Sequence, residues 1–345
     1  MIEILTHNKR ITALANLGDW LAQGDTALNT LIHNASLRNA WFTPAYTQKA
    51  LDAISNTLTI RNLEHWLQPY ADTYTEEPKN VGLILAGNIP LVGFHDILCV
   101  LMSGNRALIK VSSQDQQLIP YLLEQLVKLE PAFTNQFRFV ERLENFDAVI
   151  ATGSNNTSRY FEYYFGKVPH IIRKNRNSVA VLNGNENPAS LYRLGNDIFD
   201  YFGLGCRNVS KIFVPEDYNF STLFEAIESF KTVAEHHKYS NNYDYNKSIF
   251  LVNGDHHLDN GFVLLKPDSK LASPLAVVYY EEYTDLPGLE KLLRDQSDNI
   301  QCIVCETTLS VNNQVVAFGQ SQQPQLWDYA DGIDTMQFLS SLHNK

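Results

Sequence analysis

One cysteine of this chain lies where a polypeptide could make a reactive thiol. Cys206 follows a Gly-Leu-Gly run at 203–205 and precedes Arg207, at a predicted break between a helix and a strand. Glycines let backbone amides approach a reacting atom, and such amides can stabilise an oxyanion. A guanidinium near the sulfur would favour the thiolate. A cysteine in such a turn is nevertheless more often a small buried residue than a nucleophile, so position alone leaves both interpretations open.

The other three cysteines are predicted to pack in the core. Cys302 and Cys305 have the C-x-x-C spacing of some redox and zinc sites, but they fall in a predicted strand and no second pair completes a zinc site. Cys99 lies in an apolar helix sequence. Four irregularly spaced cysteines do not indicate a disulfide framework, which favours a reducing compartment.

Two histidine doublets could recruit a metal if the fold brought them together. His236-His237 and His256-His257 both have polar flanks, and adjacent side chains point apart in regular structure. We therefore interpret both doublets as parts of solvated loops and predict no metal site.

Polar residues also follow three predicted strands. Asn88 ends the apolar run that starts at Val81, Lys110 ends the next strand, and Thr152-Gly153-Ser154 follows a third. Ligands of parallel sheets bind at the carboxyl ends of strands. Asn88 could donate to an oxyanion or be a simple turn residue, and Lys110 could bind a ribose or phosphate or only face solvent. Neither G-x-G-x-x-G nor a Walker lysine loop is present.

The elements that would position these residues alternate after a helical beginning. The first eighty residues show helical spacing of apolar side chains, and strands alternate with helices from Val81 onward, which predicts an α/β fold with a parallel sheet. Pro90 is expected in the first turn of a helix that runs to Met102, and Ser113 with Gln116 is expected to cap the next one. We interpret residues 234–247 as an exposed loop and residues 248–252 as a strand.

Length and charge limit the function further. The chain has 345 residues, 44% of them hydrophobic, which suffices for two domains. A formal net charge of −11 makes nucleic acid a poor partner. The residues at the N-terminus do not form a secretory signal, and the apolar run 81–102 is interrupted by polar residues, so we expect a cytoplasmic protein without a membrane span.

The order of these signals resembles the aldehyde dehydrogenase superfamily. Asn88-Ile89-Pro90-Leu91 resembles its asparagine–x–proline turn, 104–110 its Gly-Asn-to-lysine strand, and Thr152-Gly153-Ser154 its cofactor loop. The segments AGNIPLVGFHDILCVLMSGN, GLGCRNVSKIFVP and DYADGIDTMQFL are more similar still to LuxC-type acyl-CoA reductases, which supply fatty aldehyde in bacterial luminescence. This likeness covers about Val81 to Leu339.

The resemblance implies a fold, a reaction and a set of roles. It implies an aldehyde-dehydrogenase-like fold with a helical N-terminus and a Rossmann-like NAD(P)-binding domain (1–175), a catalytic domain (176–310) and a C-terminal segment (311–345) that packs back on them. Cys206 would be the acyl-accepting nucleophile and Asn88 an oxyanion donor. Lys110 and Ser112 would contact the adenosine ribose, and Thr152, Gly153 and Ser154 would lie along the pyrophosphate and nicotinamide. It also implies NADPH, with NADH possible, an acyl-CoA substrate, a homo-oligomer and an acyl-activating or acyl-transfer partner enzyme.

Three departures from the superfamily pattern bear on the reaction. The stretch Arg173–Val179 has no carboxylate where aldehyde-oxidising members carry the base that activates water, which favours acylating, reductive chemistry. Lys270 stands where a ribose-binding glutamate is expected, and Ser158 replaces a glycine of the cofactor loop. Reduction of an acyl phosphate or acyl adenylate, and a non-catalytic scaffold of the same fold, remain alternatives.

Overall fold

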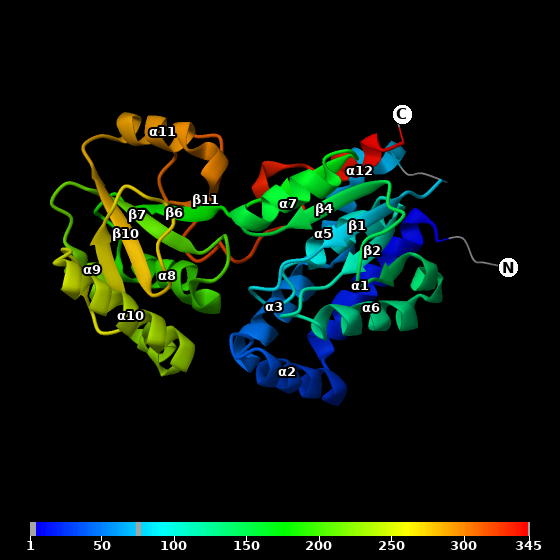
Figure 1. Ribbon diagram of the computed structural model, residues 1–345, viewed down its shortest axis with the longest axis horizontal. Coiled ribbons are helices and arrows are strands. Elements are labelled where there is room, and N and C mark those ends of the chain that lie inside the picture. Colours follow the sequence, from blue (N-terminus) through cyan, green and yellow to red (C-terminus); the bar gives the residue numbers. More distant parts are fainter. Residues whose placement is uncertain (1–4, 74–76, 344–345) are drawn as a thin grey trace. The chain divides into compact units, whose positions relative to one another are not determined.

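The computed structural model describes residues 5–73 and 77–343 of the chain and divides it into two compact units (Figure 1). Unit 1 comprises the chain up to Asn175 together with Gln325–Tyr329 and the residues from Ile333 onward. Unit 2 comprises Arg176–Pro324 and Ala330–Gly332. The first four residues, which entered the prediction that there is no secretory signal, lie outside the described residues.

Unit 1 is built on a parallel five-stranded sheet with the strand order β3-β2-β1-β4-β5. This is the strand order of a Rossmann half. The order in which strands are added to the sheet reverses between β1 and β4, and this reversal leaves a crevice at the carboxyl ends of these two strands. The strands are β1 (Asn80–Ile84), β2 (Arg106–Lys110), β3 (Phe137–Phe139), β4 (Ala148–Thr152) and β5 (His170–Arg173).

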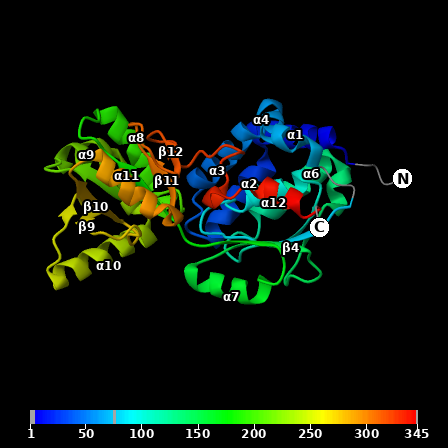
Figure 2. The same cartoon turned by 90° about the horizontal axis from the view of Figure 1, so that it is seen from above.

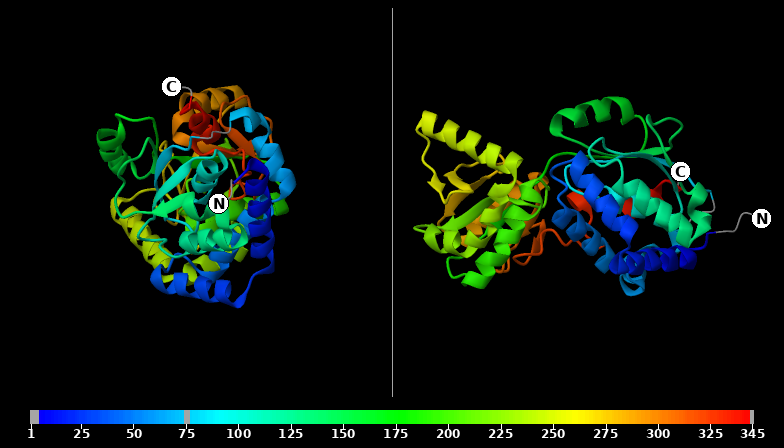
Figure 3. Two further views of the ribbon diagram at one scale, coloured as in Figure 1. Left: turned by 90° about the vertical axis from the view of Figure 1, so that its right-hand side faces the viewer. Right: turned by 90° about the horizontal axis from the view of Figure 1, so that it is seen from below.

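Helices cover both faces of this sheet. Figures 2 and 3 show α7 on one side and α1 and α6 on the other. In α1, Ile11, Leu14 and Leu21 recur at helical spacing and are buried, so the amphipathic pattern of the sequence is realised as a packed face. The helices of unit 1 are α1 (His7–Gln23), α2 (Thr26–Arg38), α3 (Pro44–Thr57), α4 (Ile60–Leu67), η1 (Gln68–Thr73), α5 (Phe94–Met102), α6 (Leu118–Leu129), η2 (Pro131–Asn135), α7 (Asn155–Phe165) and α12 (Thr335–Ser341).

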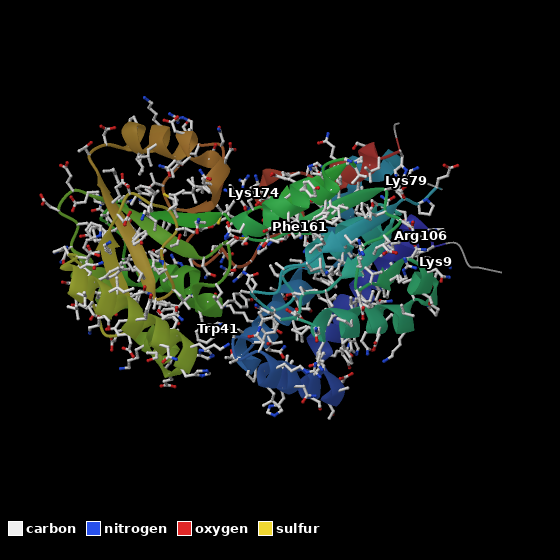
Figure 4. All side chains as sticks on the ribbon, in the orientation of Figure 1. Lys9, Trp41, Lys79, Arg106, Phe161 and Lys174 are labelled. Carbon is white, nitrogen blue, oxygen red and sulfur yellow. The ribbon has the colours of Figure 1, made fainter. Side chains whose placement is uncertain are left out.

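Two aromatic side chains of α7 anchor it to the sheet. Phe161, which is labelled in Figure 4, packs with Phe165 against a buried cluster that includes Val149 and Ala151 of β4. The start of α7 is thereby fixed at the carboxyl end of β4, where the Thr-Gly-Ser loop lies.

Unit 2 is a second α/β layer structure. Its seven-stranded sheet has the order β12-β11-β6-β7-β10-β9-β8 and is parallel except for the β8–β9 pair. Figure 1 shows α11 on one face of the sheet and α8, α9 and α10 on the other. The elements are β6 (Asn177–Val181), α8 (Pro188–Phe199), η3 (Asp200–Gly203), β7 (Val209–Pro215), α9 (Phe220–Ile227), η4 (Glu228–Glu235), α10 (His237–Asn253), β8 (Leu258–Asp259), β9 (Leu264–Pro267), β10 (Val277–Tyr283), α11 (Leu286–Asp295), η5 (Ser297–Asn299), β11 (Ile300–Val304), β12 (Gln314–Val316) and η6 (Ala330–Gly332).

The α/β class and the parallel sheet are confirmed, but four local predictions are wrong. Residues 237–253 form the single helix α10, so neither the loop predicted at 234–247 nor the strand predicted at 248–252 exists. Helix α5 begins at Phe94, and Pro90 lies in the preceding turn. Helix α6 begins at Leu118, whose N–H is bound by the Asp115 carboxylate, so Ser113 does not open this helix.

Candidate active site

Cys206 is the one exposed cysteine among the four of the chain. It lies between η3 and β7 in unit 2, and its carbonyl accepts a hydrogen bond at 3.0 Å from the hydroxyl of Ser178, which is fully buried on β6. Cys99, Cys302 and Cys305 are buried, as predicted. Burial raises the pKa of Cys99 well above its ordinary value and raises that of Cys305, which keeps both as thiols.

The residues just before Cys206 form a strained turn. Tyr201 (φ 52°) and Phe202 (φ 59°) have left-handed backbone conformations, followed by Gly203 (φ 79°). A left-handed conformation costs about 1–3 kcal/mol for a residue other than glycine, and it persists only where the surroundings impose it. Both aromatic side chains are buried, and the Phe202 ring lies 4.4 Å from that of His236. Such strain clusters at functional sites, which supports a functional interpretation of this turn.

The amide of Asn208 closes the same turn. Asn208 is buried, and its Oδ1 accepts the N–H of Gly205 at 2.8 Å. Its Nδ2 donates to the carbonyls of Asp197 at 3.0 Å and Asp200 at 2.9 Å. One side chain thus connects the end of α8, the start of η3 and the residue before the cysteine.

Arg207 has a structural role that the sequence did not reveal. Its guanidinium is buried and donates to the carbonyl of Ser321 at 2.6 Å and to Oε1 of Gln314 at 2.7 Å. The loop it binds is also held by Asp197, whose carboxylate accepts the N–H groups of Gly319 and Ser321. Arg207 therefore ties the Cys206 turn to residues 314–321.

The Asn88 turn follows β1 in unit 1 and is also strained. Asn88 is half-buried, and Leu91, three residues later, has a φ of 59°. The N–H of Leu91 donates to the buried carboxylate of Asp115 at 3.0 Å. A Cβ on Gly87 would lie 2.4 Å from the Ser112 hydroxyl, so only glycine fits there. The turns after β1 and β2 are therefore locked together.

The two other residues predicted to contact a ribose lie at the end of β2. Lys110 is exposed at the last position of the strand. Ser112 is half-buried, and its hydroxyl accepts the N–H of Gln114 at 3.2 Å, which leaves its proton free to be donated. Asn88, Lys110 and Ser112 thus share the carboxyl edge of the parallel β1–β2 pair.

Thr152 ends β4 at the same edge, and Gly153 and Ser154 lead from it into α7. The Ser154 hydroxyl caps this helix by accepting the N–H of Thr157 at 3.3 Å. A Cβ on Gly153 would meet Phe161 at 2.9 Å, so this glycine permits close packing of α7. The N-terminus of a helix at this crevice is a favourable position for a phosphate group.

The remaining candidates do not form a centre. The rings of His236 and His237 stack at 5.2 Å, so the prediction that they point apart in a solvated loop is wrong. Within residues 5–73 and 77–343 no group of three or more His, Cys, Asp or Glu side chains could hold a metal ion. The same residues contain no helix long and apolar enough to cross a membrane.

Comparison with protein families identifies the chain. Residues 54–224, which include both Asn88 and Cys206, match the family model described as acyl-CoA reductase (LuxC). Over this segment, which is about half of the chain, the protein matches the LuxC family. The family and its fold agree with the prediction of an oxidoreductase enzyme.

A curated relative of this protein is the long-chain acyl-protein thioester reductase of Aliivibrio fischeri. The two are 32% identical over 114 residues, which are 32% of this chain and 22% of the relative. The match therefore spans less than a quarter of the relative's length.

Solved structures with the same fold include several aldehyde dehydrogenases. The Physcomitrella patens aldehyde dehydrogenase 21, in complex with succinate, has a TM-score of 0.69 and 13% identity over 99% of this chain and 85% of its own. An E. coli NADP-dependent enzyme has a TM-score of 0.69 and 12% identity over 92% and 78%. A putative aldehyde dehydrogenase from Burkholderia cenocepacia has a TM-score of 0.67 and 14% identity over 90% and 79%. These structures confirm the predicted aldehyde-dehydrogenase-like fold.

Proposed function

We propose that this protein reduces an acyl thioester, with acyl-CoA as the first candidate, to an aldehyde through an acyl group carried on Cys206. One observation carries the proposal: a single exposed cysteine stands in a strained, clamped turn, while the other three are buried. A reactive cysteine must be accessible and ionisable, whereas a buried thiol is inert.

The proposed chemistry begins with attack of the Cys206 thiolate on the thioester carbonyl carbon. The amide of Asn88 and the N–H of Cys206 donate to the oxyanion, the bond to the CoA sulfur breaks, and CoA leaves as a thiolate. When bound, a reduced nicotinamide would supply the hydride that, together with a proton from the medium, converts the acyl-cysteine to a thiohemiacetal. Collapse of the thiohemiacetal transfers its hydroxyl proton to the medium and releases the aldehyde and the Cys206 thiolate.

The residues of unit 1 fit a nicotinamide dinucleotide. Its strand order places the carboxyl ends of β1, β2 and β4 at one edge, together with the start of α7. In dinucleotide-binding folds a carboxylate after the second strand binds the ribose 2′-hydroxyl, whereas a cation accommodates a 2′-phosphate. Lys110 ends β2 and is exposed. We therefore propose NADPH over NADH, with Ser112 on the same ribose and residues 152–154 along the pyrophosphate and nicotinamide.

The segment that stands where the superfamily carries its water-activating base supports a long-lived acyl-cysteine. The stretch Arg173–Val179 contains no carboxylate. Arg173 pairs with the buried Asp96, and Arg176 pairs with Asp331 at 3.4 Å, so its two arginines are engaged in structural contacts. An acyl-cysteine without a neighbouring base to activate water should persist until it is reduced.

A protein-bound thioester is the second candidate donor. The Aliivibrio fischeri relative is described as an acyl-protein thioester reductase, which favours an acyl group on a protein cysteine as an alternative to CoA. The same thiol could also accept an acyl group from an acyl phosphate or acyl adenylate. A non-catalytic scaffold would require Cys206 to be unreactive.

Trapping the acyl-enzyme tests the proposal. The protein is incubated with acyl-CoAs of increasing chain length, with an acyl-protein thioester and with an acyl phosphate, all without reductant, and peptide mass spectrometry locates the acyl group. We expect acylation of Cys206, no acylation of Cys206→Ala, and aldehyde release once NADPH is added. Asn88→Ala should fold and acylate about 10²- to 10³-fold more slowly, since one oxyanion donor is lost.

Cys305→Ala is the matched control, because it removes a buried thiol from the same unit and should leave acylation intact. An acyl group on another residue, or normal aldehyde formation by Cys206→Ala, would refute the mechanism. Acylation by none of the donors would favour the scaffold.

A further inference from the structure

The turn that presents Cys206 is built from a left-handed run of three residues, 201–203, and one buried amide. Asn208 reaches back along the chain and bonds to backbone groups on both sides of this run. Its Nδ2 bonds to carbonyls before the run, at short distance to those of Asp197 and Asp200 and at 3.5 Å to that of Ile198. Its Oδ1 accepts the N–H of Gly205, the residue that precedes the cysteine.

The amide can make these hydrogen bonds in one orientation only, because exchanging Nδ2 and Oδ1 would place donor against donor and acceptor against acceptor. Both Nδ2 protons have carbonyl partners at 3.0 Å and 2.9 Å, and Oδ1 has an N–H partner at 2.8 Å. A carboxylate of the same shape would place an acceptor against two carbonyls. The turn therefore needs an amide at this position, and Asn208 is 3% exposed, so water does not replace it.

Other elements hold the same turn from outside it. The Phe202 ring contacts those of His236 at 4.4 Å and Tyr239 at 6.2 Å, which belong to the segment from η4 into α10. The Ser178 hydroxyl of β6 holds the Cys206 carbonyl at 3.0 Å. Asn208 is the member of this set that binds the backbone on both sides of the strained run.

We propose that Asn208 is a positioning residue that fixes the backbone of Gly205 and Cys206 and, through it, the direction of the Cys206 thiol and N–H. This inference rests on the proposed function, because it assigns Asn208 to the same nucleophile. Asn208 does not itself touch the substrate. Its removal should slow acyl transfer to the sulfur and leave the binding of the acyl donor nearly unchanged.

Acylation kinetics with a pH series separate this role from a purely structural one. Acyl transfer from acyl-CoA to Cys206 is measured in the full-length wild type, Asn208→Ala and Asn208→Asp. We expect Asn208→Ala to lower the maximal acylation rate about 10- to 100-fold with little change in half-saturating acyl-CoA, since misplacement of a reacting group by about 1 Å can cost about 10²-fold. In Asn208→Asp the defect should deepen as the pH rises, because only the protonated acid can donate to a carbonyl.

Asn313→Ala is the matched control. Asn313 lies in the same unit and also donates to two backbone carbonyls, those of Ser297 at 2.9 Å and Ile300 at 2.8 Å, but none of its bonds involves the turn. Its loss should lower thermal stability and leave the acylation rate within about twofold, as for additive sites without shared partners. Equal losses in Asn313→Ala and Asn208→Ala, or a wild-type rate in folded Asn208→Ala, would overturn the proposal.

Iodoacetamide keeps the test independent of the acyl donor. Its rate of reaction at Cys206, resolved by peptide mass spectrometry, should differ between wild type and Asn208→Ala and be unchanged in Asn313→Ala. If wild type accepts no acyl group, the proposed function fails, yet this comparison still decides whether Asn208 positions the thiol. If Asn208→Ala does not fold, the pH dependence of Asn208→Asp decides, and a defect that does not change with pH would refute the inference.

Discussion

The buried carboxylate of Asp115 leads to a quantitative prediction about stability and pH. Burial raises the pKa of Asp115 from its ordinary 3.8 to about 6, although the carboxylate accepts the N–H groups of Leu91 and Leu118. The folded protein therefore binds this proton more tightly than the unfolded chain does. A difference of this size corresponds to about 3 kcal/mol, at about 1.4 kcal/mol for each pKa unit.

The sign of the effect follows from this direction. Below about pH 3.8 both states hold the protonated acid, and the contribution of Asp115 to stability is fully present. As the pH rises through about 6 the folded state must ionise a buried group, so the free energy of unfolding falls by about 3 kcal/mol. Asp115→Asn cannot ionise and does not undergo this change.

Urea unfolding of wild type and Asp115→Asn at several pH values measures the difference. Near pH 4 the variant should be less stable than wild type by about 1–3 kcal/mol, because the amide NH2 cannot accept one of the two N–H groups, of Leu91 and Leu118, that the acid accepts. Near pH 7 the difference in unfolding free energy should have shifted by about 2–3 kcal/mol in favour of the variant, because only the wild type must ionise a buried group. Asp197→Asn repeats the experiment in unit 2, because burial also raises the pKa of Asp197 to about 6.

Either of two results would refute this reasoning. A difference in unfolding free energy that does not change with pH would mean that the Asp115 carboxylate is not ionised in a buried environment. A variant that loses stability relative to wild type as the pH rises would mean that the hydrogen bonds from Leu91 and Leu118 outweigh the cost of burial.

Two further predictions concern charged residues of unit 1. Arg173→Met should lower the free energy of unfolding by about 3–5 kcal/mol, because it leaves the buried Asp96 without its partner, and adding Asp96→Leu should recover most of this loss. Urea unfolding measures the single and the double variant, and equal losses of unfolding free energy in the two would contradict the prediction. Lys110→Glu should lower the ratio of kcat/KM for NADPH to kcat/KM for NADH at least about tenfold, which corresponds to about 1.4 kcal/mol. The control is Lys128→Glu, which makes an equal charge change at the exposed end of α6. An unchanged ratio in Lys110→Glu would rule out a role of Lys110 in binding the 2′-phosphate.

The sequence predicted the central strands well, because strands buried on both faces are continuous apolar runs between turn residues. Val81, Ala107 and Val149 all lie in predicted strands that form the sheet of unit 1. Helix α10 was missed for a physical reason. Its buried residues, Tyr239, Tyr243, Asn246 and Phe250, have helical spacing, but most of the residues between them are polar, so the segment has the composition of an exposed loop.

The candidate site was predictable only in part. Cys206, Asn88 and Lys110 were found because their residue types and places in the chain suggest chemistry. Asn208 and Asp115 were missed, because their partners are mostly backbone groups brought near by the fold. The signal that could have found Asp115 is its position before the apolar run at Leu118, which suits a residue that caps a helix.

The path of the C-terminal residues means that unit 1 cannot be isolated by a single cut in the chain. Tyr329 accepts the indole N–H of Trp66 at 2.8 Å, and Thr335 accepts a guanidinium N–H of Arg173 at 2.9 Å. A fragment that stops at Asn175 would leave both donors in the interior without these acceptors, at a cost of about 1–3 kcal/mol for each buried group. Such a fragment should need a peptide carrying residues 325–343 in order to fold, so the first half of the chain becomes a complete domain only after residues 325–343 have been synthesised.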